Sequence, residues 1–284
     1  MDINWFPGHM AKALRTIKEQ LPLVDLVLEI CDARIPRSSR NPELQAVLED
    51  KPSVIVLNKA DLADPRITEE WLRCAASAGL SAVPCNSKKK EGFEALIAES
   101  LRKAGEKTAA GRKNRPLRLM AVGIPNSGKS TLINSMTGRR AARTSDRPGV
   151  TRGPQRIKSR DGSIEWLDMP GVLLPKLETE EQKLSLSATG AIKDQLLPIE
   201  EVAYFLFKDL LESYPEETAA RYRIQEFYED PYENYLEAAR KKGCIRSGGK
   251  VDSRRFAEML LNDFRSGKIG RISLERCREK EGRL

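Results

Sequence analysis

The segment that most constrains this 284-residue chain is Gly123–Thr131, which reads Gly-Ile-Pro-Asn-Ser-Gly-Lys-Ser-Thr. It matches Gly-x-x-x-x-Gly-Lys-Ser/Thr, the pattern of a loop whose backbone N–H groups converge on phosphate at a helix start. The apolar run 117–122 before it predicts a buried strand, and residues 131–136 after it predict a helix. A plain glycine-rich turn before a helix is the alternative, but it does not require the preceding strand. The sequence therefore predicts a nucleoside triphosphate site.

The residue types in this loop suit phosphate chemistry. Gly123 and Gly128 allow backbone angles and a close approach that a side chain would block. Lys129 is expected at the β- and γ-phosphates, and the Ser130 hydroxyl is expected on Mg²⁺. The nucleotide-binding candidates in the loop are Asn126, Ser127, Gly128, Lys129, Ser130 and Thr131.

A second motif, Asn58-Lys59-Ala60-Asp61, follows the apolar run 53–57, which predicts a strand covered on both faces. A carboxylate at Asp61 accepts hydrogen bonds from N1–H and the exocyclic amine of guanine, whereas adenine offers neither donor there. Asn58 is expected to tie this loop to the phosphate loop, and the Lys59 stem is expected to pack on the base. Four letters alone carry little weight, but together with the phosphate loop they favour GTP and GDP over ATP.

A third motif, Asp168-x-x-Gly171, ends a hairpin predicted over residues 155–167. In a nucleotide site such an aspartate reaches Mg²⁺ and the glycine N–H contacts the γ-phosphate. The alternative is an ordinary aspartate in a Pro-Gly turn. Thr151 lies between the phosphate loop and Asp168 and is the first candidate for a second hydroxyl on Mg²⁺. Thr144 is the weaker candidate for this role.

The order of these motifs is unusual. An ordinary small GTPase runs from the phosphate loop to Asp-x-x-Gly and then to Asn-Lys-x-Asp. Here the Asn-Lys-x-Asp motif comes first, followed by Asn86 and Ser87, whose loop is a candidate contact for the guanine oxygen. Every motif still follows a predicted strand, and open α/β sheets bind ligands at the carboxyl ends of their strands. We therefore expect a circularly permuted P-loop GTPase domain with a doubly wound, mostly parallel sheet.

The remaining elements follow from apolar periodicity. Strands are expected at 23–30, 53–57, 82–85 and 117–122, and helices at 10–21, 42–48, 68–78, 93–103, 198–214, 231–242 and 253–266. No strand is expected after Pro175. These patterns predict a GTPase domain over 1–177 and a helical domain over 178–284, with the basic stretch 102–118 as an exposed connector. That the helical domain binds RNA is what the family resemblance described below implies.

Charge is segregated along the chain, which carries a net charge of +8. Residues 240–284 contain fourteen Lys and Arg against six Asp and Glu, whereas residues 178–239 contain five against fifteen. Basic residues also gather in 139–160. Such segregation favours a polyanion-facing surface.

Five cysteines without a Cys-x-x-Cys pair indicate free thiols in a reducing cytosol. We expect no membrane partner, since no apolar run approaches about 20 residues. We expect no DNA partner either.

Five segments give the chain a resemblance to a known family. These are Trp5–Met10, Asp32–Pro36, Asn58–Asp61, Gly123–Ser130 and Asp263–Gly267. They resemble the ribosome biogenesis GTPase A, or YlqF-type, family over nearly the whole chain. The resemblance implies a cytoplasmic GTPase that acts on the large ribosomal subunit precursor and its rRNA, with Asn126 as a ligand for an activating K⁺.

One departure from ordinary GTPases concerns the attacking water. They carry a water-positioning Gln directly after Asp-x-x-Gly, and here that residue is Val172. Intrinsic hydrolysis is therefore expected to be slow and stimulated by ribosomal particles. His9, the only histidine, is expected in a turn before the first helix, where it either activates water or serves a structural role. The catalytic candidates are His9, Lys129, Thr151 and Gly171.

A rival function belongs to another class. The chain is either a hydrolysing switch or an RNA-binding assembly scaffold that holds GTP as a structural ligand. Turnover in the presence of ribosomal particles separates the two.

Overall fold

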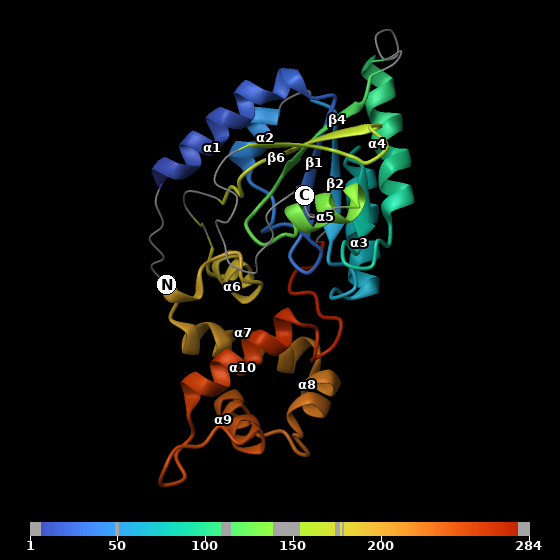
Figure 1. Cartoon of the computed structure of the whole chain (residues 1–284). Coiled ribbons are helices and arrows are strands. Elements are labelled where there is room, and N and C mark those ends of the chain that lie inside the picture. Colours follow the sequence, from blue (N-terminus) through green and yellow to red (C-terminus); the bar gives the residue numbers. More distant parts are fainter. Residues whose placement is uncertain are drawn as a thin grey trace.

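The computed structural model describes residues 7–48, 51–108, 115–138, 154–173, 177 and 179–277, without the side chains of 7–10 and 106–108 (Figure 1). Within these ranges a six-stranded sheet runs in the order β3-β2-β1-β4-β6-β5. The strands are β1 (Leu26–Asp32), β2 (Ser53–Asn58), β3 (Ala82–Cys85), β4 (Leu117–Val122), β5 (Gln155–Lys158) and β6 (Ile164–Asp168). All neighbours are parallel except the β5–β6 hairpin. The mostly parallel sheet is confirmed.

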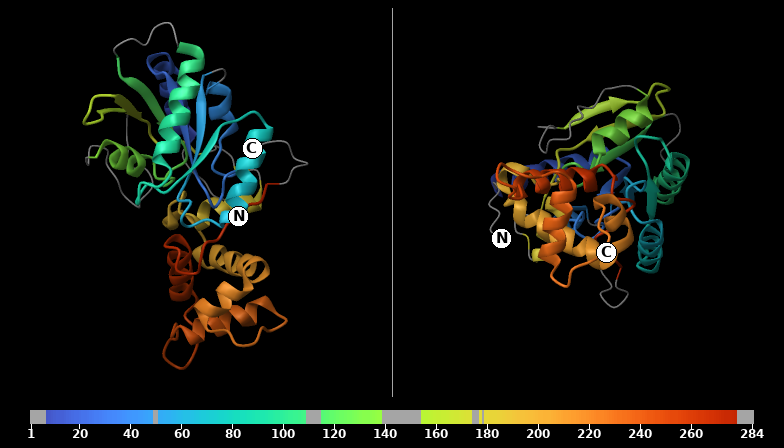
Figure 2. Two further views of the ribbon diagram at one scale, coloured as in Figure 1. Left: turned by 90° about the vertical axis from the view of Figure 1, so that its right-hand side faces the viewer. Right: turned by 90° about the horizontal axis from the view of Figure 1, so that it is seen from below.

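Helices cover both faces of this sheet (Figure 2). One face carries α1 (Pro7–Gln20), α2 (Pro42–Leu48) and α3 (Pro65–Ser77), with the 3₁₀ turn η1 (Leu21–Leu23) after α1; the other carries α4 (Phe93–Thr108) and α5 (Lys129–Thr137). Leu28 of β1 packs with Leu96 of α4 and Leu132 of α5, whereas its neighbour Val27 packs with Ile17 of α1. Successive strand residues point to opposite faces, so strands buried on both sides appear in the sequence as continuous apolar runs.

A group of helices lies at the carboxyl ends of the strands (Figure 1). They are α6 (Glu180–Ala188), η2 (Asp194–Leu196), α7 (Ile199–Ser213), α8 (Pro215–Tyr222), α9 (Pro231–Lys241) and α10 (Ser253–Arg265). Their core is aromatic, with Phe207 of α7 and Phe256 of α10 6.2 Å apart between ring centroids. The same apolar cluster continues to Trp71 of α3. The helical character after Pro175 is confirmed, although the short helices α6 and α8 were not predicted.

The residues after α10 return to the α/β part as a segment that we call the C-terminal strap, residues 269–277. The Leu274 N–H donates to the Arg34 carbonyl at 2.9 Å, and the Trp71 indole donates to the Glu275 carbonyl at 3.0 Å. A disulfide joins Cys74 of α3 to Cys277. The expectation of five free thiols is therefore wrong for these two, because the fold brings together cysteines 203 residues apart.

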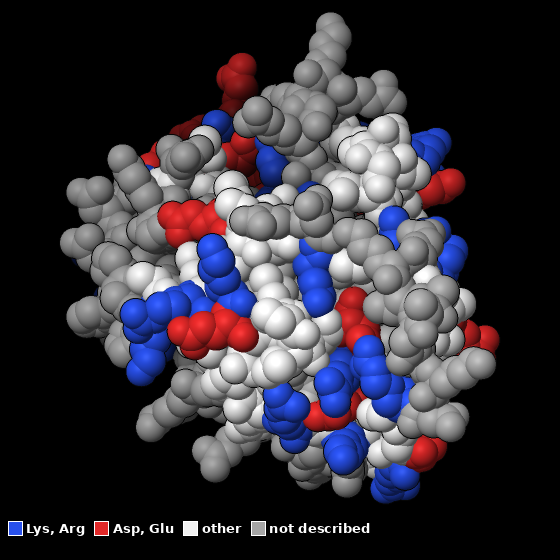
Figure 3. All heavy atoms as spheres, turned by 90° about the horizontal axis from the view of Figure 1, so that it is seen from above, with Lys and Arg blue, Asp and Glu red and all other residues white. Residues whose placement is uncertain are grey.

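The basic connector expected over 102–118 is shorter than its charge pattern suggested. Residues 102–108 belong to α4, and 117–118 belong to β4. Two of the described basic side chains have acidic partners: Arg102 pairs with Glu99 one turn earlier in α4, and Arg115 pairs with Asp25 at 2.7 Å. Figure 3 shows this end of the molecule, where Lys and Arg lie beside Asp and Glu.

β1 begins three residues later than predicted, because residues 21–23 form the turn η1. None of the helices in the described ranges has the length and apolarity needed to cross a membrane.

Candidate functional site

The predicted motifs converge at one edge of the sheet, as the carboxyl ends of parallel strands must. Asn58, at the end of β2, is the residue that joins them. Its amide donates to the Ser127 carbonyl of the phosphate loop at 2.8 Å, and its Oδ1 accepts from the Ser87 hydroxyl at 2.6 Å. One buried side chain thus holds three loops together, and the predicted tie between Asn58 and the phosphate loop is present.

The glycines of the phosphate loop are required by backbone conformation and by crowding. Gly123 has φ +141° and Gly128 has φ +94°, in the region that L side chains rarely adopt. A Cβ on Gly128 would overlap the Asn58 amide, and a Cβ on Gly123 would overlap the Ile30 carbonyl oxygen. Gly171 is equally confined, since a Cβ there would lie 2.8 Å from the Pro125 nitrogen. The loop is therefore a shaped cradle that leaves its N–H groups accessible at the start of α5.

Lys129, Ser130 and Asp168 meet at this cradle. The Lys129 ammonium donates to the carbonyls of Gly123 (3.1 Å) and Ile124 (2.8 Å), inside the loop. Burial lowers its pKa to about 8, and the Asp168 carboxylate acts against this shift. The Ser130 hydroxyl donates to Asp168 Oδ2 at 3.1 Å.

The donor set at Asp168 fits Mg²⁺. Asp168 Oδ1 is buried and finds no hydrogen-bond partner in the described part of the chain. Burial raises the pKa of this carboxyl, and Lys129 and the Ser130 hydroxyl act against the shift. A buried carboxylate oxygen next to a serine hydroxyl is the oxygen donor set that a hard divalent cation prefers.

The guanine loop, residues 58–61, has a well-defined shape. Lys59 takes φ +59° and its ammonium reaches Asp32 Oδ2 of β1 at 2.9 Å. Burial lowers the pKa of Lys59, while Asp32 acts to raise it. The Ala60 N–H donates to the Cys85 carbonyl at 3.0 Å, which fixes the loop against β3. Asp61 is partly exposed, and no described residue donates to its carboxylate, so the carboxylate has acceptor capacity for a base.

Asn86 and Ser87 both make contacts within the protein. The Asn86 Oδ1 accepts from the N–H groups of Lys88 (3.2 Å) and Lys89 (3.3 Å), and its amide donates to Glu91. Ser87 is held by Asn58. These side chains therefore shape the loop, and a contact with the guanine oxygen would come from its backbone.

Three predicted residues fall partly or wholly outside the described structure. Thr151 and Thr144 lie outside it, and so does the side chain of His9. The segment expected to be a turn before the first helix is the first turn of α1, and this expectation is corrected. His9 lies one helical turn before Ala13, which packs in the same apolar cluster as Val172.

Two sets of contacts at the site were not predicted from the sequence. The Asn126 amide donates to the Gly190 carbonyl between α6 and η2 at 2.7 Å, a contact between segments 64 residues apart. Asp32 and Arg34 form a buried ion pair beside Lys59. A charged residue at the end of an all-buried strand was the available signal for Asp32.

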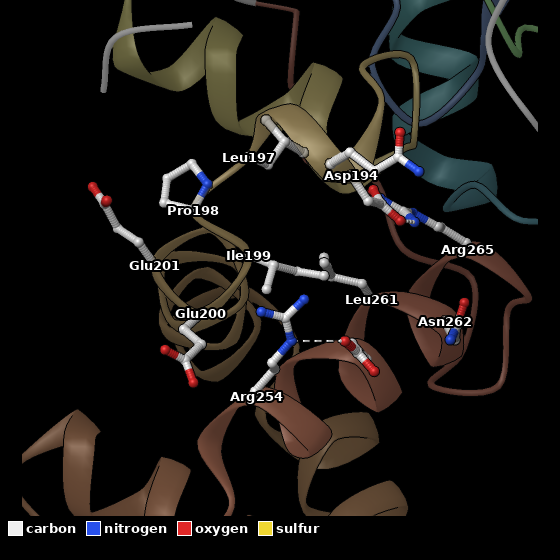
Figure 4. Close-up of a pocket in the computed structure, with 12 residues that line it drawn as sticks. Asp194, Leu197, Pro198, Ile199, Glu200, Glu201, Arg254, Leu261, Asn262 and Arg265 are labelled. Atoms are coloured by element: carbon white, nitrogen blue, oxygen red, sulfur yellow. Dashed lines mark hydrogen bonds and ion pairs between the residues drawn. The ribbon is translucent and has the colours of Figure 1, made fainter.

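A groove of about 720 Å³ lies outside this constellation, between α10 and the start of α7 (Figure 4). Glu200 and Glu201 line it from α7, and Arg254, Leu261 and Arg265 line it from α10. None of its lining residues belongs to the nucleotide motifs, so the groove is a separate feature of the C-terminal helices.

Comparison with known proteins agrees with this geometry. Residues 118–231 match the family model described as 50S ribosome-binding GTPase. The ribosome biogenesis GTPase A of Priestia megaterium is 42% identical over 286 residues, covering 99% of each chain. The chain belongs to the ribosome biogenesis GTPase A family. The ribosome biogenesis GTPase A of Thermotoga maritima is 32% identical, over 96% of this chain and 94% of its own.

A mitochondrial relative and a solved structure are also similar to this chain. Mitochondrial ribosome-associated GTPase 1 of Mus musculus is 36% identical, over 96% of this chain and 90% of its own. The crystal structure of GNP-bound YlqF from T. maritima superposes with a TM-score of 0.64 at 28% identity, covering 93% of this chain and 98% of that one. The predicted family, the P-loop GTPase fold and the GTPase class are thereby confirmed.

Proposed function

We propose that this protein is a GTP-hydrolysing switch that acts late in assembly of the large ribosomal subunit and binds rRNA according to its nucleotide state. The observation that carries the proposal is the junction at Asn58, which holds the guanine loop, the Ser87 loop and the phosphate loop together. We expect such a junction where a single ligand contacts one loop with its base and another with its phosphates. The relatives named for ribosome biogenesis supply the partner class.

The binding roles follow from the contacts described above. Asp61 accepts from the guanine edge, while the N–H groups of the cradle and the Lys129 ammonium bind the β- and γ-phosphates. Ser130 and Asp168 would hold Mg²⁺, with Thr151 as the further ligand. When bound, Mg²⁺ neutralises charge between the β- and γ-phosphates. Gly171 packs on the phosphate loop at Pro125. Its N–H would contact the γ-phosphate and lose this contact when the γ-phosphate is released.

Water activation requires a group other than residue 172. Val172 is fully buried in the cluster with Ala13 and has no polar atom on its side chain. We assign water activation to His9, at the start of the helix that carries Ala13. K⁺ is a second source of charge stabilisation. It would bind Oδ1 of Asn126, while the amide nitrogen of the same side chain donates to the Gly190 carbonyl.

The order of the motifs supports circular permutation. The strand of the guanine loop, β2, precedes the strand of the phosphate loop, β4, and the matched GTPase family model begins only at residue 118. We divide the chain into a GTPase domain, 1–177, and a helical RNA-binding domain, 178–284. Because the loop after Gly171 leads into the helices, release of the γ-phosphate changes how the helices are held.

The RNA-binding assignment rests on charge. Basic residues in 240–284 outnumber acidic ones by eight, and phosphate contacts position a protein on nucleic acid without reading its sequence. The acidic stretch 178–239 confines this surface to the end of α9, to α10 and to the C-terminal residues after α10. We also propose that the protein acts in the cytoplasm, where bacteria assemble their ribosomes.

The test is sedimentation with ribosomal subunits in GDP and in a non-hydrolysable GTP analogue, together with GTP turnover in the presence of the particles. Preferential sedimentation with large-subunit particles in the analogue, and stimulated turnover, are expected. Binding that ignores the nucleotide, with no stimulated turnover, would instead support the scaffold function.

A further inference from the structure

Residues 264–267 are the end of α10 together with the two residues that follow it, and we call them the last turn of α10. They contact the segments that hold the guanine loop. The Phe264 carbonyl accepts from Arg34 Nη1 at 3.2 Å, and the Arg34 guanidinium lies 4.8 Å from the centroid of the Phe264 ring. Gly267, at φ +73°, lies so close to Leu62 that a Cβ would come within 2.7 Å of the leucine Cδ2. Leu62 directly follows Asp61, so α10 packs against the loop assigned to guanine.

Arg34 transmits this contact to Lys59 through Asp32. Arg34 and Lys59 both donate to the Asp32 carboxylate. Arg34 does so bidentately, at 2.9 and 2.8 Å, and Lys59 does so at 2.9 Å. Asp32 and Arg34 are each only 1% exposed. Burial acts to raise the pKa of Asp32, but the two cations beside it outweigh burial and hold the pKa well below its usual value. A buried carboxylate shared by two cations fixes both of them, because displacing either would leave charge unpaired.

The strap reaches the guanine loop from its outer side. Arg271 donates from Nη2 to the Ala60 carbonyl and from Nε to the Ala63 carbonyl, both at 2.9 Å. The Ile272 N–H donates to the Leu62 carbonyl at 2.9 Å. The backbone between Lys59 and Asp61 is thus anchored by a side chain that comes from beyond α10.

The same turn of α10 also grips the segment next to the phosphate loop. Arg265 donates to the carbonyls of Ser187 and Ala188 at 2.9 Å and forms a bidentate pair with Asp194, which Figure 4 shows beside it. The Gly190 carbonyl in this segment accepts from Asn126. Both nucleotide loops are therefore connected to one turn of one helix.

We propose that Arg271 and the Asp32–Arg34 pair are positioning residues for guanine recognition, and that the last turn of α10 holds them. Recognition of the base therefore depends on where the C-terminal helices sit. A partner that displaces α10 loosens the guanine loop and lowers affinity for guanine nucleotides. This inference rests on the proposed function, in which Asp61 reads the base.

The test compares affinity for GDP with affinity for IDP, whose base lacks the exocyclic amine that Asp61 would accept from. In the full-length chain, Arg271→Ala is expected to weaken GDP binding about tenfold and IDP binding clearly less, because only GDP uses both bonds to Asp61. A general loss of folded protein would lower both affinities equally. Arg271→Lys, which keeps a charged donor, is expected to recover part of the difference.

Lys268→Ala is the matched control. Lys268 lies three residues before Arg271, is 60% exposed and pairs only weakly with Asp263 at 3.8 Å. It is expected to leave the GDP-to-IDP affinity ratio unchanged. If Arg271→Ala keeps the wild-type ratio, this inference is overturned while the proposed function stands. If the wild-type protein itself binds GDP and IDP equally, the base assignment of the proposed function fails and the inference fails with it.

A second measurement uses the unaltered chain. Coupling between two sites is reciprocal, so GDP binding should slow hydrogen exchange at the amides of residues 266–268, by about threefold or more. The amides of α9 are the internal control, because the contacts described above do not join α9 to the nucleotide loops. Equal exchange at 266–268 with and without GDP would contradict the link.

Discussion

The side-chain amide of Asn58 donates to the backbone carbonyl of Ser127 across 2.8 Å, although 69 residues separate them. A hydrogen bond between the loop assigned to the base and the loop assigned to the phosphates makes the two parts of the site one unit. Asn58 also binds Ser87, so a displacement of any of the three loops should displace the other two.

Base recognition is tested by Asp61→Asn. The change removes a charged acceptor for two guanine donors, so GTP affinity should fall on the order of 100-fold. The affinity for xanthosine triphosphate should rise, because its additional carbonyl accepts a hydrogen bond from the new amide. Competition binding against a fluorescent guanine nucleotide measures both effects. Equal affinity of the wild-type protein for ATP and GTP would rule out the base assignment.

His9→Ala tests the assignment of water activation. GTP affinity should be retained, and hydrolysis stimulated by ribosomal particles should be abolished. Lys12→Ala, an exposed change one turn further along α1, is the control and should keep the stimulated rate. Phosphate release under single-turnover conditions is the measurement. A wild-type rate for His9→Ala on the particle would make the histidine structural.

RNA contact is tested by removing four positive charges near the C-terminus. Replacing Lys241, Lys242, Arg254 and Arg255 with Gln should weaken association with ribosomal particles and leave GTP affinity unchanged. If each neutralises one phosphate, the slope of log affinity against log salt falls by up to about 4. The control removes four charges from α1 and α3: Lys12, Arg15, Lys18 and Arg73. Association that does not depend on salt would contradict the proposal.

Asp209 of α7 gives a prediction for stability against pH. Burial, with Glu212 and Glu181 nearby, raises its pKa to about 6, above the ordinary value of 3.8. The folded state therefore prefers the protonated form, and stability is lost as pH rises from about 4 to 6. Asp209→Asn should match the wild type near pH 3.5 and exceed it above pH 6, by roughly 1 kcal/mol because solvent screens this partly exposed group.

Chemical denaturation at several pH values measures this difference. Glu212→Gln removes one of the neighbouring charges and should give a smaller gain of the same sign. A constant difference between Asp209→Asn and wild type across pH 4 to 7 would show that ionisation of Asp209 is not its cause.

Local patterns determined most of the fold. The bounds of β3 and β4 and the apolar face of α10 follow from short-range rules, because strands buried on both faces need continuous apolar runs and amphipathic helices need apolar residues every three or four positions. Gly243 and Gly267 take positive φ after α9 and α10, the conformation in which helices commonly end at glycine. The loops that bring Asn58, Gly128 and Asp168 to one edge were predictable too, because each directly follows a parallel strand.

Long-range contacts were decided only by the tertiary structure. The sequence offers no periodicity that pairs Cys74 with Cys277, sets Arg271 against Ala60, or brings the Phe264 carbonyl to Arg34. These partners lie about 200 residues apart or more, and their meeting depends on how the C-terminal helices pack on the sheet. The sequence shows which residue type stands in which motif. Which distant residue each side chain contacts depends on the packing of the whole molecule.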